Sequence, residues 1–77
     1  MASVNFYNPR ALEILSLLFA KRQELSYEEL SVQLGYAVNE LYGGMEDLQL
    51  AGYAVELEEG VFAITAKGLD YASTLWP

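Results

Sequence analysis

The sequence contains no cysteine and no histidine, and only four of its 77 residues are lysine or arginine. The missing thiols exclude disulfides and thiolate chemistry, and the missing imidazoles exclude the usual zinc sites, histidine bases and the simplest pH switch. No stretch approaches the roughly 20 apolar residues of a membrane span, and the N-terminus lacks the features of a signal peptide. We therefore expect a cytoplasmic protein that neither enters a membrane nor holds a metal ion.

Cationic side chains are also outnumbered, because eleven carboxylates give the chain a net charge of −7. Proteins gain most of their non-specific affinity for nucleic acid by releasing counterions with lysine and arginine, which are scarce here. The chain is 53% hydrophobic, too apolar for a disordered segment, and its length allows one domain with a small core. So much apolar content in a short chain indicates that some apolar surface is buried against another subunit or partner.

Helix start and stop signals divide the chain into short elements. Asn8 followed by Pro9 is a typical helix entry, and Ser26 with Glu29 forms a capping box. Beyond Gly52, apolar and polar residues alternate with the two-residue period of a half-buried strand. After a lead-in at 1–8, we expect a single domain over 1–77 with helices at 9–22, 26–35 and 38–51, a hairpin at 53–65 and a C-terminal helix at 66–76.

Four phrases occur in the order typical of one family. They are SYEELSVQLGY and VNELYGGMEDLQLAGY, which suit the two halves of a helix-turn-helix, EDLQLAGYAVEL, which leads into a wing, and FAITAKGLDYA, which leads into a last helix. Over roughly residues 10–76 the chain resembles the winged helix-turn-helix superfamily. The resemblance implies an α+β winged-helix fold in which the third helix enters the DNA major groove. The fold also serves RNA binding and protein contacts, so the function has to be argued from the site.

The elements that would face DNA are acidic. Residues 39–60 contain six carboxylates and no lysine or arginine, and only Asn39 and Gln49 could read base edges. The carboxylates are Glu40, Glu46, Asp47, Glu56, Glu58 and Glu59. Because they would repel the phosphates, the usual mode of DNA binding is disfavoured.

Three interpretations of this acidic surface remain: a solvated face, a binding site for a basic protein, and a nucleic-acid mimic. Mimicry requires a denser and more even array of carboxylates, so it is the least favoured. The main hypothesis is a small acidic regulator, adaptor or inhibitor that binds a partner protein through the third helix and the wing. We predict the contact residues Glu40, Tyr42, Gly43, Glu46, Asp47 and Glu58.

The few cations lie at the ends of two predicted helices. Lys21 and Arg22 complement the negative end of the first predicted helix, and together with solubility this explains the cations without a further function. The alternative hypothesis is a transcription regulator that binds DNA in a non-standard way through a small basic patch. Its contact residues would be Arg10, Lys21, Arg22 and Lys67.

Two adjacent glycines, Gly43 and Gly44, lie inside the third predicted helix, where each costs about 1 kcal/mol relative to alanine. Packing against another helix is favoured for Gly44, which falls near the inner face, whereas Gly43 lies closer to the rim. There are two other interpretations. The pair forms a flat surface where a partner chain approaches closely, or the helix breaks at the pair.

Six tyrosines and one tryptophan form an aromatic set larger than so small a core needs. Tyrosine and tryptophan are enriched at protein interfaces, where one end of the side chain is wet and the other buried. We expect Tyr36, Tyr42 and Trp76 at exposed contact positions and Tyr53 in the core.

The first predicted helix is apolar on nearly every side, since only Glu13 and Ser16 interrupt the apolar run at 11–20. A surface helix of a monomer usually has a wider polar face. The pattern therefore predicts a homodimer formed by the first helix with the end of the last one. The expected interface residues are Leu12, Leu15, Phe19 and Trp76.

No catalytic motif is present. Without histidine or cysteine, the five serines have no partner pattern of a nucleophile with its base, and no glycine-rich loop has phosphate-binding spacing. The adjacent carboxylates Glu28–Glu29 and Glu58–Glu59 do not match a glycosidase pair or a calcium-binding loop. We expect a protein that is not an enzyme and uses no cofactor.

Overall fold

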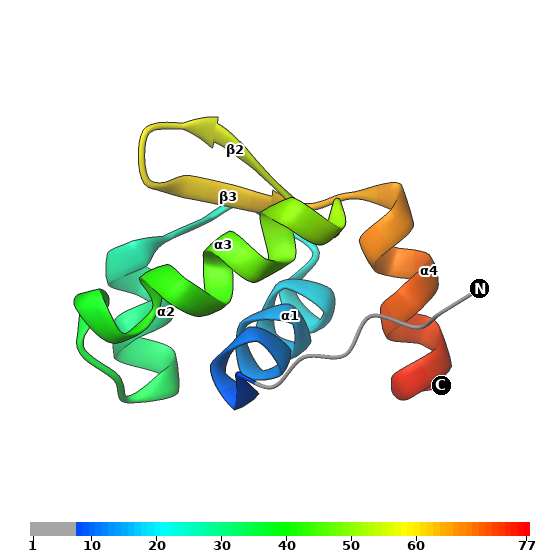
Figure 1. The fold of residues 1–77 in the computed structure, drawn as a ribbon, viewed down its shortest axis with the longest axis horizontal. Helices are drawn as coiled ribbons and strands as arrows, with labels where there is room; N and C mark the ends of the chain where they lie inside the picture. The colour runs from blue at the N-terminus through cyan, green and yellow to red at the C-terminus, as the bar shows by residue number, and fades with distance from the viewer. Residues whose placement is uncertain (1–7) are drawn as a thin grey trace.

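The computed structural model describes residues 8–77 and shows a mixed α+β fold, which confirms the predicted class. Within that part of the chain, four α-helices and one 3₁₀ turn accompany a three-stranded antiparallel sheet (Figure 1). The elements in chain order are α1 Pro9–Lys21, β1 Leu25–Ser26, α2 Tyr27–Leu34, η1 Val38–Glu40, α3 Tyr42–Ala51, β2 Ala54–Glu58, β3 Val61–Ile64 and α4 Ala66–Leu75. Of the predicted lead-in, only Asn8 belongs to the described residues.

The first two helices begin where their capping signals place them. The Asn8 side chain accepts a hydrogen bond from the Arg10 N–H at 3.0 Å, and Pro9 occupies the first helical position. At α2, the Ser26 hydroxyl accepts from the Glu29 N–H at 3.1 Å while the Glu29 carboxylate accepts from the Ser26 N–H at 2.8 Å. The predicted capping box is therefore confirmed, and it satisfies two backbone donors that the helix itself leaves unpaired.

The prediction of one continuous helix over 38–51 is wrong. Residues Val38–Glu40 form a 3₁₀ turn, which the Leu41 N–H closes by donating to the Val38 carbonyl at 2.9 Å. The Glu40 carboxylate accepts from the Ala37 N–H at 3.1 Å and so stabilises this tighter turn. Regular α-helical bonding begins only after Leu41, whose side chain is buried in the core. The break thus precedes the glycine pair, which lies inside α3.

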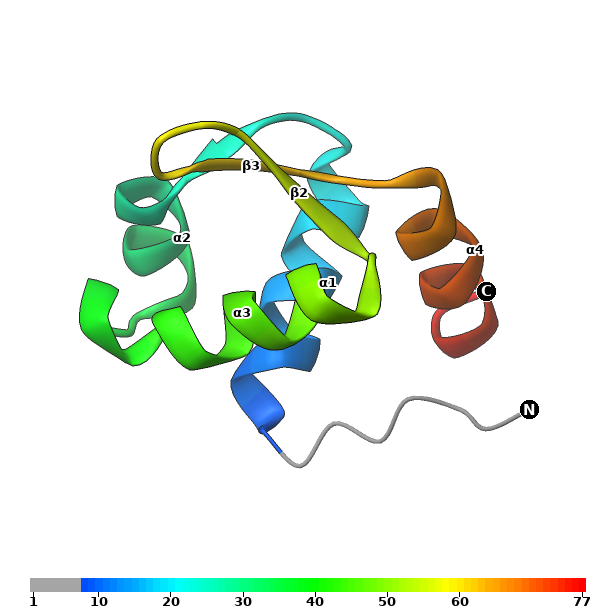
Figure 2. The ribbon, with the colours of Figure 1, turned by 45° about the horizontal axis from the view of Figure 1, so that its top comes forward.

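Helix α1 lies at the centre of the fold and packs against α2, α3 and α4 (Figure 2). Its apolar sides meet apolar residues of every neighbouring element, which explains why its polar strip is so narrow. Burying each leucine, isoleucine or phenylalanine in such a core contributes about 1.5–3 kcal/mol. The large side chains that are completely or almost completely buried are Ile14, Leu15, Leu18, Leu25, Leu30, Leu41, Met45, Leu48 and Phe62.

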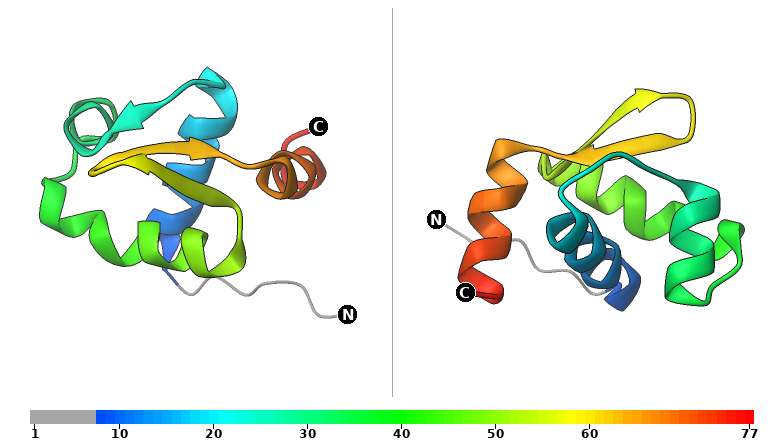
Figure 3. Two further views of the ribbon diagram at one scale, coloured as in Figure 1. Left: turned by 90° about the horizontal axis from the view of Figure 1, so that it is seen from above. Right: turned by 180° about the vertical axis from the view of Figure 1, so that it is seen from behind.

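The three strands have the order β1-β3-β2, so the hairpin strand β3 is central and β2 forms an edge (Figure 3). Strand β1 pairs Leu25 with Phe62 and Ser26 with Val61. This two-residue strand was not predicted, because it is too short for a periodic pattern. The predicted hairpin turn is present at Glu59 and Gly60, where Gly60 has a φ of 78° that favours glycine.

Helix α4 continues directly from β3 and packs beside α1. The Thr65 hydroxyl accepts from the Gly68 N–H at 2.9 Å and donates to the Gly52 carbonyl at 2.6 Å, which connects the start of α4 to the end of α3. In the part of the chain that the structure describes, every helix is too short or too polar to cross a bilayer.

Candidate functional site

The outer face of α3 carries most of the predicted partner-binding residues. Tyr42, Glu46 and Leu50 follow one another at intervals of four residues, so their side chains share one side of the helix. All three are exposed, Leu50 at 80% and Tyr42 at 53%. Gly43 is exposed beside them, whereas Asp47 is half-buried at the rim of the face. The structure therefore places acidic and apolar groups side by side on this helix.

Strand β2 presents acidic and apolar side chains on opposite faces of the sheet. Val55 pairs with Ala63, and Glu56 pairs with Phe62, whose side chain is buried in the core. Residues directly opposite one another share a face, so Glu56 points to the core side at the rim of the sheet and Val55 to the outer side. Glu58 is exposed beyond a bulge near the turn.

A series of aromatic rings connects α2, α3 and the sheet. The ring centre of Tyr27 lies 5.0 Å from that of Tyr42 and 4.9 Å from that of Phe62, and both contacts are edge-on. Tyr42 is 53% exposed while Phe62 is buried, so the series runs from the surface into the core. Burial raises the pKa of Tyr27, and the negative charge of Glu56 raises it further, as does Tyr42. Gly60 connects the two residues, because its N–H donates to the Glu56 carboxylate and its carbonyl accepts from the Tyr27 N–H.

Glu40 contributes to the local structure rather than to the α3 face. Besides closing the 3₁₀ turn, its carboxylate forms an ion pair with Arg10 at 3.3 Å, the only ion pair among residues 8–77. The Arg10 guanidinium lies 3.9 Å from the centre of the Tyr36 ring, and the Tyr36 hydroxyl donates to Glu13 at 3.0 Å. Tyr36 is half-buried in these contacts, so this cluster fastens η1 to the start of α1.

Glu40 should titrate below the ordinary range of a glutamate. The Ala37 N–H and then Arg10 lower its pKa, so its contribution to stability is present above the ordinary glutamate pKa and is lost as the pH falls through the lowered value. We expect Arg10→Met to raise the pKa of Glu40 without restoring it fully, because the Ala37 N–H still binds the carboxylate. A carbon-13 NMR titration of the side-chain carboxyl measures both values. An unchanged pKa in Arg10→Met would contradict the assignment.

The four cations predicted for the alternative DNA contact do not form one patch. Arg10 and Lys21 lie near opposite ends of α1, about 16 Å apart along a helix axis that rises 1.5 Å per residue. Arg10 is already paired, and the guanidinium of Arg22 lies over the Phe19 ring while its Nε donates to the Phe19 carbonyl at 2.7 Å. The Lys67 ammonium lies 5.6 Å from the centre of the Tyr53 ring, which is buried as predicted.

Of the four residues predicted for a dimer interface, Leu15 lies in the core instead of at the surface. Its side chain is completely buried in the core of its own chain, so it has no surface to offer a second copy. The helical period alone could not distinguish it from its neighbours, because α1 is apolar on almost all sides. Phe19 and Trp76 are half-buried against each other, with ring centres 6.2 Å apart, and Leu12 is half-buried.

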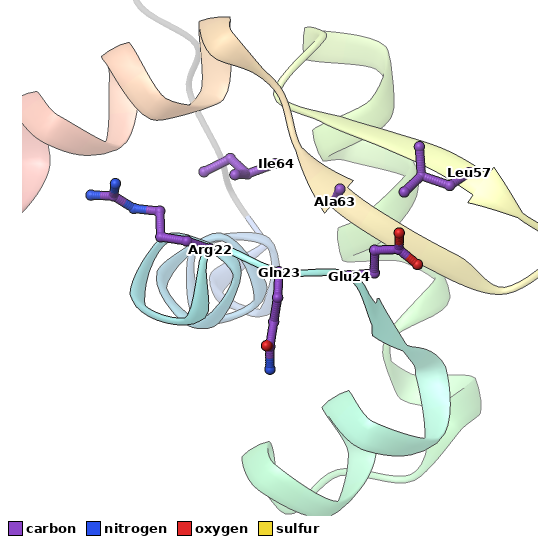
Figure 4. A pocket seen from close by; sticks show the side chains of 6 residues that line it. All are labelled: Arg22, Gln23, Glu24, Leu57, Ala63 and Ile64. Carbon is purple, nitrogen blue, oxygen red and sulfur yellow. The ribbon is translucent and has the colours of Figure 1, made fainter.

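A shallow hollow lies between the α1–β1 connection and the hairpin (Figure 4). Figure 4 shows Leu57 and Ala63 pointing to the same side of the sheet, the outer side. The hollow is lined by Arg22, Gln23, Glu24, Leu57, Ala63 and Ile64. None of the residues predicted to contact a partner protein lines it, so it is distinct from the α3 face, and of the cations predicted for the alternative DNA contact it includes Arg22. Among residues 8–77, no group of three or more acidic side chains is arranged to hold a metal ion.

Comparison of the chain with protein-family models, with curated proteins and with solved structures finds no match. The candidate site therefore depends on its own geometry. Sequence reasoning missed Leu50, although its spacing from Tyr42 and Glu46 was available as a signal. It also missed the ring contact of Tyr27 with Tyr42 and the link from Tyr27 through Gly60 to Glu56, for which no local signal exists.

Proposed function

We propose that the chain is a small acidic winged-helix protein that acts by binding another protein, as a regulator, adaptor or inhibitor. Two features support the winged-helix assignment. A short strand precedes α2 and pairs with the returning strand of the hairpin, and α3 immediately precedes the hairpin, as the reading helix precedes the wing in that fold. The chain resemblance over 10–76 points to the same arrangement.

The observation that carries the protein-binding function is the mixture of side chains on α3 and β2. Of the six large apolar side chains that are exposed in the described part of the chain, Tyr42 and Leu50 lie on the α3 face beside Glu46, whereas Val55 and Leu57 lie on the outer side of β2. Exposed apolar groups that are surrounded by polar ones are a feature of protein interaction sites. The neighbouring carboxylates favour a partner with basic groups at the rim of its interface.

The same mixture disfavours the competing functions. A duplex would bring phosphates against Glu46 and Glu58, and the exposed leucines would gain nothing from its backbone. A nucleic-acid mimic needs carboxylates spaced like phosphates, whereas here apolar side chains interrupt them. The homodimer remains a second, separate proposal, now restricted to Leu12, Phe19 and Trp76 together with the exposed Leu75.

Charge reversal on α3 tests the proposed function. We expect wild-type protein and Asp70→Arg to retain one and the same partner from an extract of the native host, and Glu46→Arg to lose it. Asp70 is a matched control, because it is also exposed but lies on α4. Mass spectrometry of the retained proteins, followed by a binding titration with the purified partner, provides the measurement.

Equal retention by Glu46→Arg and Asp70→Arg would contradict a binding site on the α3 face. A titration with random duplex DNA at low salt provides the second check. Sub-micromolar binding that weakens steeply with added salt would favour the DNA-binding alternative, since that dependence reports the release of counterions from phosphates.

A further inference from the structure

Tyr27, Tyr42 and Glu56 come together from three different elements. Tyr27 begins α2, Tyr42 begins α3, and Glu56 lies in the middle of β2. The two tyrosine rings are 5.0 Å apart at an interplanar angle of 82°, so one ring meets the other edge-on. Glu56 is exposed at the rim of the sheet on the side of these rings.

The Glu56 carboxylate is held in position by the hairpin turn. One of its oxygens accepts from the Gly60 N–H at 2.8 Å, and the Gly60 carbonyl accepts from the Tyr27 N–H at 3.1 Å. Tyr27 is fixed from the other side by its ring contact with the buried Phe62. The turn, the carboxylate and the ring are therefore arranged before any ligand arrives.

This arrangement suits a cation. Aromatic rings attract ammonium and guanidinium groups through their electron-rich faces, and a nearby carboxylate adds a charge partner. The molecule already uses the same chemistry elsewhere, where Arg10 lies over Tyr36 and pairs with Glu40. Tyr42 is 53% exposed as a residue, and the next turn of α3 adds the exposed carboxylate of Glu46.

We propose that Tyr27, Tyr42 and Glu56 form a binding site for a lysine or arginine side chain of the partner protein. This inference rests on the proposed protein-binding function and specifies its anchor. The charge of the surrounding surface attracts a basic segment. The contact with the Tyr42 ring then makes the binding specific for one side chain, which a general attraction between opposite charges does not.

The test uses the full chain and a glycine-spaced peptide that carries two arginines, followed by nitrogen-15 NMR. We expect the signals of Tyr27, Tyr42, Glu56 and Gly60 to shift with peptide, and the same peptide with glutamine in place of arginine to shift none of them. Tyr42→Ala and Glu56→Gln should each weaken binding about fivefold, and Tyr42→Phe, which keeps the ring, should remain within about twofold. Glu56→Gln also keeps an oxygen for the Gly60 N–H, so the turn is preserved.

Glu59→Gln is the matched control, because it removes one exposed charge from the same turn without touching the site. Equal weakening by Glu59→Gln and Glu56→Gln, or wild-type affinity in Tyr42→Ala, would overturn the cation site. If that happens while Glu46→Arg still loses the native partner, the protein-binding function stands without this anchor. If instead Glu46→Arg keeps the partner, the α3 face is not the binding site, and if the wild-type chain retains no partner at all, the proposed function itself is wrong, whatever the peptide does.

Discussion

Alanine at Gly44 is expected to lower the free energy of unfolding by about 2 kcal/mol, within the range for overpacked cores. A Cβ at this position would lie 2.8 Å from the Ala11 nitrogen, 3.1 Å from the Arg10 carbonyl carbon and 3.2 Å from the Ala11 Cα. All three atoms belong to the backbone of α1, which cannot turn aside as a flexible side chain would. Helices α1 and α3 would have to separate, and the core between them would loosen.

The same substitution at Gly43 provides the control. This residue is exposed, and a Cβ there would meet only the Asn8 side chain, at an ordinary 3.5 Å. Because alanine favours the helix over glycine, Gly43→Ala should be neutral or stabilising by up to about 1 kcal/mol. Urea unfolding followed by circular dichroism measures both variants. Effects of the same sign and size at the two positions would contradict the close approach of α1 and α3.

Leu15→Ala should have an even larger effect, a loss of about 3 kcal/mol in the free energy of unfolding, as is typical of a fully buried leucine. Its side chain is inaccessible to solvent and belongs to the core that α1 shares with its neighbours. Leu12→Ala, three residues earlier on a half-buried side of α1, should cost less than half as much. Thermal unfolding of the two variants at equal concentration measures both losses, and a loss in Leu12→Ala as large as that in Leu15→Ala would contradict the core position of Leu15.

The same pair of variants separates stability from association. If a homodimer forms through α1, Leu12→Ala should raise its dissociation constant, which light scattering over a concentration series measures. A monomeric mass of the wild-type chain at high micromolar concentration would contradict the homodimer, and the core position of Leu15 would remain unaffected by that result.

Local signals predicted the helix starts well, because capping depends on residues close together in the chain. Asn8, Ser26 and Thr65 all accept the backbone hydrogen bonds that their residue types favour at a helix start. The 3₁₀ turn before α3 was missed because the Glu40 carboxylate, which accepts from the Ala37 N–H within the turn, is also held by Arg10 of α1. A partner thirty residues away leaves no trace in a local pattern.

In the candidate site, too, local features could be predicted from the sequence, whereas contacts between distant residues could not. The excess of carboxylates over 39–60 was visible in the sequence, and so was the exposure of Tyr42 on the outer face of the third helix. The neighbourhood of Tyr27, Tyr42 and Glu56 was not, since it depends on how α2, α3 and the hairpin pack around Phe62. Charge can be read from composition, whereas the position of a charge beside a ring requires the tertiary structure.

Strand β2 has one further consequence, for the behaviour of many copies at once. An edge strand offers unpaired backbone groups to any other extended chain, which is a common route to aggregation. Here a bulge interrupts the edge between Glu56 and Glu58, and like charges would face each other if two such edges met. The carboxylates proposed to select a basic partner would thus also keep neighbouring copies from joining their sheets in a crowded solution.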